Sequence, residues 1–84
     1  MEKIAGIVAT DPRNDAGRIH FLLNREDGRK PLSCMSAVDF SGSIPKIGMP
    51  ITLIGEHKAD LVLSSRRTPY FVFSQTENPP LVST

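Results

Sequence analysis

The chain contains no tryptophan, one tyrosine and one cysteine among its 84 residues. A single cysteine, Cys34, forbids an internal disulfide, and neither histidine has metal-ligand spacing with another cysteine, histidine or carboxylate pair. A chain of this length buries a small core, which usually needs a disulfide, a metal or self-association as a supplement. Because the first two are not expected, we predict one small domain that forms a homodimer or a higher homo-oligomer and uses no cofactor.

The sequence also lacks long apolar runs and any large excess of charge. No stretch approaches the ~20 apolar residues that cross a bilayer, so we expect no membrane association. Ten Lys/Arg against nine Asp/Glu give a net charge of +1, which excludes a protein that coats polyanions through bulk charge. Residues 1–6 alternate charged and apolar side chains, unlike the apolar stretch of a signal peptide. Together with the lone thiol, this pattern predicts a cytoplasmic protein.

The pattern that is present is the alternation typical of β-strands. Turn residues at Asn14–Gly17 and Glu26–Gly28 separate extended segments, and Gly55 predicts a bend within one of them. The segment Asp39–Pro45 is too rich in turn residues for a full helix. The predicted strands cover residues 3–10, 18–25, 30–38, 49–58 and 70–76. Five short strands predict an all-β, partly closed barrel over residues 1–77, followed by a flexible tail at 78–84.

Four stretches, Ala5–Arg13, Ile19–Arg25, Ile47–Gly55 and Tyr70–Phe73, follow one another in a familiar order. This order resembles the oligonucleotide/oligosaccharide-binding (OB) fold of bacterial single-stranded DNA-binding proteins and the related primosomal replication protein. The resemblance implies a five-stranded OB barrel in which the helix between the third and fourth strands is shortened or absent. The chain departs from the family in two respects. The tryptophans that stack on bases are absent, and the sequence has no acidic, Phe-terminated extension for recruiting repair partners.

Single-strand binding needs cations for phosphates and flat rings for bases. Cations gather at two predicted turns, and in an OB fold these turns project from the same side of the barrel. We expect phosphate contacts from six side chains: Arg25, Arg29, Lys30, Lys58, Arg66 and Arg67. We expect Tyr70 and Phe40 to stack on bases, whereas Phe21 shares the pattern of a core residue. The alternative is that turns collect charge simply because they are solvated, and Glu26 and Asp27 would weaken the first cluster.

Catalytic features are sparse. Cys34 and His20 fall on neighbouring predicted strands, which is the minimum for a thiolate pair, but a small buried thiol is the ordinary interpretation of Cys34. No glycine-rich phosphate loop opens a helix. We therefore do not expect an enzyme.

The resulting hypothesis is a non-enzymatic, non-sequence-specific protein that binds single-stranded nucleic acid. Single-stranded DNA is the expected ligand, with RNA left open, and the expected setting is DNA replication, recombination or transfer, with replication or repair proteins as further partners. The alternative hypothesis is an OB-fold adaptor that pairs with another protein in a larger complex without contacting nucleic acid. The near-neutral charge and the missing tryptophans favour this alternative.

Overall fold

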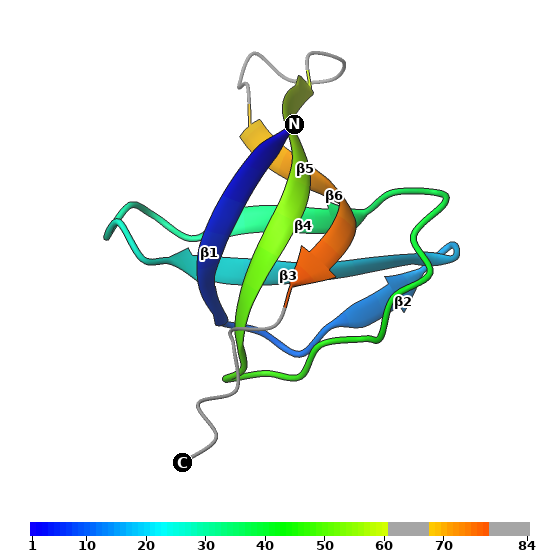
Figure 1. The fold of residues 1–84 in the computed structure, drawn as a ribbon, viewed down its shortest axis with the longest axis horizontal. Coiled ribbons are helices and arrows are strands. Elements are labelled where there is room, and N and C mark those ends of the chain that lie inside the picture. Colours follow the sequence, from blue (N-terminus) through cyan, green and yellow to red (C-terminus); the bar gives the residue numbers. More distant parts are fainter. Residues whose placement is uncertain (61–67, 78–84) are drawn as a thin grey trace.

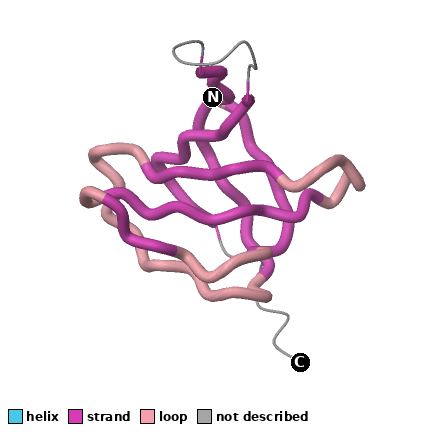
Figure 2. Tube along the Cα trace, turned by 180° about the vertical axis from the view of Figure 1, so that it is seen from behind, coloured by secondary structure: helices cyan, strands magenta, loops and turns pink. Residues whose placement is uncertain are grey.

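A computed structural model describes residues 1–60 and 68–77 of the chain. These residues form six β-strands and no helix (Figures 1 and 2). The strands are β1 (Glu2–Val8), β2 (Arg13–Asp15), β3 (Arg18–Arg25), β4 (Leu32–Ser36), β5 (Pro50–Asp60) and β6 (Thr68–Glu77). Over the described ranges, there is accordingly no helix of the length and apolarity that crossing a membrane would require.

The strands make one sheet in the order β1-β5-β6-β4-β3-β2, and a further pairing of β1 with β3 closes it. Five strands therefore form a closed barrel, while β2 is an extra strand hydrogen-bonded to β3. All pairings are antiparallel except that of β4 with β6. The predicted fold class, a small five-stranded OB-like barrel without a full helix after the third barrel strand, is confirmed.

The inward faces of the strands make a continuous apolar core. Phe71 and Phe73 of β6 are completely buried, and Phe21 of β3 packs with its ring centroid 5.6 Å from that of Phe73. The remaining core residues are Val8, Ile19, Leu23, Leu32, Cys34, Ile51 and Leu53. The buried hydroxyl of Ser36 accepts a hydrogen bond from the Ile19 backbone N–H at 2.8 Å, so it is not an unsatisfied polar group. The predicted core positions of Phe21 and Cys34 are confirmed.

The bend predicted at Gly55 is present, because the β5–β6 register shifts between Ile54 and Gly55. Beyond this irregularity, β5 is no longer paired with β1 and continues with β6 as an arm to the pair Asp60 and Thr68, while β6 stays paired with β4 at Tyr70–Phe73. The arm rises beside the amino-terminal end of β1 (Figure 1). The carboxylate of Glu2 fastens that end to the arm, accepting hydrogen bonds from the backbone N–H and ring Nδ1 of His57 at 3.0 and 2.8 Å.

The strand β2 was not predicted, because residues 14–17 were assigned to a turn. Only Ala16 and Gly17 form that turn, with positive φ values of 52° and 81°. Positive φ at both central residues is characteristic of the tight turn that matches the twist of a β-hairpin. Asp15 consequently pairs with Arg18, and β2 folds back along β3.

Candidate nucleic-acid interface

The outer face of the sheet aligns four side chains in one row across four strands. Tyr70 of β6 pairs with Lys58 of β5 on one side and with Ser33 of β4 on the other. Ser33 in turn pairs with Leu22 of β3. Strand neighbours of these residues, such as Phe71 and Cys34, point into the core, so the row itself faces outward. We call Leu22, Ser33, Tyr70 and Lys58 the outer row.

A second line of residues runs parallel to the outer row. In register order it contains Arg13, His20, Met35, Val72 and Glu56. Arg18 also reaches this line, with its Nη1 atom 3.0 Å from Met35 Sδ. Lys58 therefore ends the outer row on the β5 side, and Arg13 ends the second line on the β2 side. Apolar and polar side chains lie between these two cations, and the Glu56 carboxylate lies on the same face as Lys58.

The turn between β3 and β4 contains the predicted cations Arg25, Arg29 and Lys30. The Arg25 guanidinium donates through Nε and Nη2 to the Lys30 carbonyl oxygen, at 3.1 and 2.7 Å. Arg29 Nε lies 3.4 Å from an Asp27 carboxylate oxygen. Two of the three cations are therefore engaged within the turn, and among the described residues only the Lys30 ammonium of this group makes no such contact.

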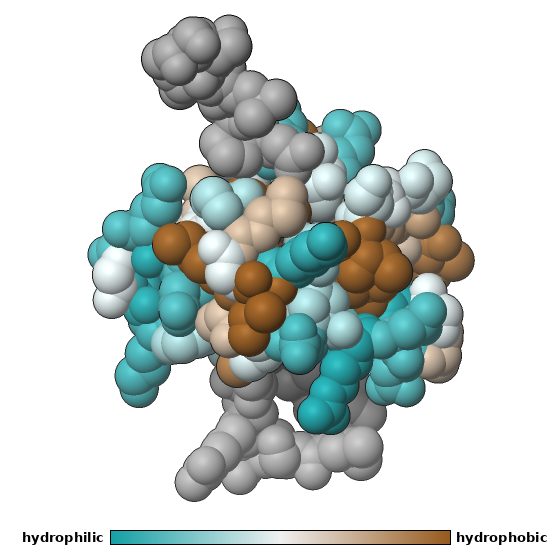
Figure 3. Space-filling view, turned by 90° about the horizontal axis from the view of Figure 1, so that it is seen from below, coloured by the Kyte–Doolittle hydropathy of each residue, from teal (hydrophilic) through white to brown (hydrophobic). Residues whose placement is uncertain are grey.

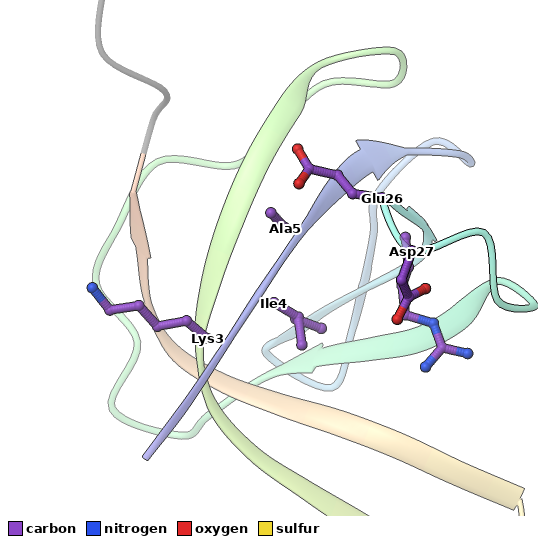
Figure 4. Close-up of a pocket in the computed structure, with 6 residues that line it drawn as sticks. Lys3, Ile4, Ala5, Glu26 and Asp27 are labelled. Atoms are coloured by element: carbon purple, nitrogen blue, oxygen red, sulfur yellow. The ribbon is translucent and has the colours of Figure 1, made fainter.

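A cavity of about 220 Å³ lies between this turn and the first half of β1. Figure 4 shows Ile4 between β1 and the turn, Glu26 and Asp27 on the turn side, and Lys3 directed away from them. Two cations, Lys3 and Arg25, thus line the cavity together with two carboxylates. Because the charges are balanced, this cavity does not provide the positive surface that a phosphate needs.

Phe40 lies elsewhere on the barrel. It is half-buried, and its ring meets that of Phe73 edge to face, with the centroids 5.1 Å apart. Phe73 is three residues from Tyr70, about 10 Å along an extended strand. The structure therefore does not place Phe40 beside Tyr70, because the Phe40 ring packs against the core residue Phe73.

Of the eight predicted contact residues, the structure places Lys58 and Tyr70 side by side. Arg25, Arg29 and Lys30 stay together at the β3–β4 turn, and Phe40 stands apart. Arg66 and Arg67 lie outside the described residues, so the expected meeting of the two basic turns stays a prediction.

The predicted contact residues did not include Asp11, Arg13 or His20, which the fold brings to this face. Arg13 and His20 are cross-strand partners, and both line a cavity of about 310 Å³ together with Asp11. The signal that was available is the alternation of His20, Leu22 and Asn24 opposite the core residues of the same strand.

The structure does not support a Cys34–His20 pair. Phe21 is the residue that pairs with Cys34, so His20 lies on the outer face while the thiol lies inside the barrel. Burial raises the pKa of Cys34 to about 12, which removes the thiolate at neutral pH. Residues 1–60 and 68–77 also contain no group of three or more His, Cys, Asp or Glu side chains arranged for a metal ion.

Comparison with known proteins gave no match to a family model, to a curated protein or to a solved structure. The arrangement of residues on the barrel is accordingly the basis for assigning a function.

Proposed function

We propose that the chain is a non-enzymatic protein that binds single-stranded nucleic acid, with DNA as the main ligand, across the outer row. The observation that carries the proposal is the pairing of a half-buried Tyr70 with an exposed Lys58 on the outer sheet face. A ring beside an ammonium group offers stacking for a base and attraction for the adjoining phosphate. Leu22 and Ser33 continue the row with an apolar contact and a hydroxyl.

The small number of contact groups on this face predicts a modest affinity for a single strand. One ring on the outer row supplies stacking worth about 1–3 kcal/mol per base. Lys58 and Lys30 are exposed, whereas Arg29 is paired with Asp27 and Arg25 is held by the turn. With few phosphate contacts, binding should be weak and salt-dependent. Self-association would multiply it through avidity.

The test is the fluorescence anisotropy of a labelled oligothymidylate, titrated with the protein at several salt concentrations. Affinity should fall from about 50 to about 200 mM salt because the protein's cations displace counterions from the bound phosphates, with a slope of about 0.7 per phosphate contact. Tyr70→Ala should weaken binding by the equivalent of ~1–3 kcal/mol, while Tyr70→Phe keeps the ring and should bind nearly as the parent does. Absence of binding at low salt would exclude the function.

A second candidate function, a protein-interaction adaptor, is favoured by a different surface. Val38, Ile44 and Ile47 of the connection between β4 and β5 are 83%, 58% and 55% exposed. Figure 3 views the end of the barrel where β1 finishes and β5 begins, and brown apolar residues interrupt the polar surface there. Several exposed apolar side chains on one surface are typical of a protein-binding site.

Size-exclusion chromatography with light scattering, with and without oligonucleotide, separates the two functions. An oligomer that ignores DNA and RNA but retains a defined protein partner would support the adaptor. The proposal for the binding protein includes a homodimer or higher homo-oligomer, a role in DNA replication, recombination or transfer, and a cytoplasmic setting suited to the unpaired Cys34 thiol.

A further inference from the structure

The segment Ala9–Arg13 is attached to β3 at two points and stands away from it between them. The Ala9 N–H donates to the Leu22 carbonyl oxygen at 2.7 Å, and the Leu22 N–H donates to Thr10 Oγ1 at 2.9 Å. Arg13 then pairs with His20. On β3, only one residue lies between Leu22 and His20. On the opposing segment, two residues, Asp11 and Pro12, lie between Thr10 and Arg13. The surplus residue pushes the segment outward and leaves the cavity of about 310 Å³.

The chemistry of this cavity is mixed. The Asp11 carboxylate and the Arg13 guanidinium both line it, with Leu22 as an apolar wall. Within residues 1–60 and 68–77, neither Asp11 nor Arg13 forms an ion pair, so both are available to a ligand. Pro12 between them fixes one backbone dihedral, and two extended residues span about 7 Å. The cavity therefore presents an acceptor and a donor at a set separation.

A carboxylate and a guanidinium in one cavity favour some chemical groups of a nucleic-acid strand over others. A phosphate would be attracted by Arg13 but repelled by the Asp11 carboxylate, whereas a nucleobase offers donors and acceptors that suit both side chains. Guanine has two adjacent N–H donors, at N1 and N2, and beside them the acceptors O6 and N7. Thymine, cytosine and adenine lack such a pair of adjacent donors for one carboxylate. Arginine donating to O6 and N7 is also the commonest specific base contact in proteins.

We propose that this cavity binds a guanine base, with Asp11 accepting hydrogen bonds from N1–H and N2–H and Arg13 donating to O6 and N7. The proposal rests on the proposed function and refines it, because it adds a base preference at one position of an otherwise unselective surface. Ser33 lines the cavity and also belongs to the outer row next to Tyr70. A strand that crosses β3, β4 and β6 therefore reaches both the cavity and the ring.

The experiment compares oligothymidylates that carry one central deoxyguanosine, deoxyinosine or 7-deazadeoxyguanosine. Inosine lacks the N2 amino group and 7-deazaguanine lacks N7, so each removes a contact assigned to one side chain. The guanine oligonucleotide should bind roughly tenfold more tightly than plain oligothymidylate, and each analogue should lose most of that preference. Asp11→Asn should bring the ratio of guanine to inosine affinity close to 1. Because the readout is a ratio, the general gain from removing a negative charge cancels.

Asp15→Asn is the matched control, since Asp15 is exposed on β2, has the same charge and does not line the cavity. This variant should keep the guanine preference. Equal affinity for all the oligonucleotides, or a preference that survives Asp11→Asn, overturns the guanine site while leaving the proposed function intact.

A titration with guanosine monophosphate, followed by NMR, tests the guanine site separately from oligonucleotide binding. Shifts of the Thr10, Asp11, Arg13 and Leu22 amide signals that are absent with thymidine monophosphate support the guanine site even if no oligonucleotide binds. If neither the oligonucleotides nor the mononucleotide bind, both the proposed function and the guanine site fail.

Discussion

Gly55 of β5 lies directly against the backbone of Val72 in β6. A Cβ atom at Gly55 would collide with the Val72 carbonyl oxygen and would stand 2.8 Å from the Phe73 Cα atom. The neighbours are backbone atoms of a paired strand, so they cannot move aside as a side-chain end would. This close approach coincides with the register shift that bends β5 and starts the arm carrying Lys58.

Gly55→Ala should therefore lower the free energy of unfolding by about 3 kcal/mol, the upper part of the usual range for overpacking. Thermal unfolding measures the change, and the midpoint should fall by more than ~10 °C in a domain of this size. Gly48→Ala is the control, because Gly48 has a φ of 83° but open space around it. That variant should lose only about 1 kcal/mol. Equal losses in the two variants would contradict a packing role for Gly55.

Lys58→Gln tests the electrostatic part of the outer row. Removing one phosphate contact to a single strand should reduce the slope of log affinity against log salt by about 0.7. The matched control is Lys46→Gln, because Lys46 is exposed in the connection before β5 and lies outside the outer row. A control variant with the same change in slope would mean that net charge, and not the position of Lys58, governs binding.

Phe40 distinguishes packing from base stacking. Because its half-buried ring contacts Phe73, Phe40→Ala should lower the free energy of unfolding by about 1–3 kcal/mol. Phe40→Leu restores apolar volume and should cost less than about 1.5 kcal/mol. Chemical denaturation gives both values. The leucine variant should keep its affinity for oligothymidylate, and a loss of affinity with stability intact would identify Phe40 as the base contact expected from the sequence.

Cys34 should be unreactive in the folded protein. The side chain is fully buried, and desolvation raises the pKa of its thiol to about 12, so the nucleophilic thiolate is scarce at pH 8. Iodoacetamide labelling, followed by mass spectrometry, should be negligible in buffer and rapid in denaturant. Rapid labelling in buffer would show that the barrel opens readily around β4.

The raised pKa of Cys34 also predicts that the free energy of unfolding depends on pH. Above about pH 9 the thiol of the unfolded chain loses its proton, while the folded thiol holds it until about pH 12. The unfolded state then binds fewer protons, so the free energy of unfolding should decrease as pH rises through this interval. Cys34→Ala provides the comparison that isolates the thiol. Identical slopes for both proteins would contradict the prediction.

The strand pattern was readable from the sequence because a strand buried on one face alternates regardless of what its partners are. Phe21 was expected to be a core residue, and it lies in the core with Ile19 and Leu23 of the same strand. The bend at Gly55 was also predicted, since a glycine inside a β-branched strand commonly marks a bulge. By contrast, β2 was missed because three residues, all exposed, leave no apolar alternation.

Site residues were harder to predict because they depend on which strands become neighbours. The pairing of Lys58 with Tyr70 follows from the β5–β6 register, which shifts at Gly55, and no local pattern records that register. Cations near one another in sequence were expected to face a ligand together. Instead Arg25 donates to the Lys30 carbonyl and Arg29 pairs with Asp27, because turn residues satisfy the nearest partners first.

By itself, the sequence determined an all-β chain with its core faces, a buried thiol and a near-neutral charge. These features follow from side-chain periodicity and composition, which act locally along the chain. Only the tertiary structure decided that Phe40 packs on Phe73 and that Asp11 and Arg13 line one cavity with Leu22. It also placed Tyr70 between Ser33 and Lys58. Those placements depend on barrel closure and strand register, which bring together residues that are distant in sequence.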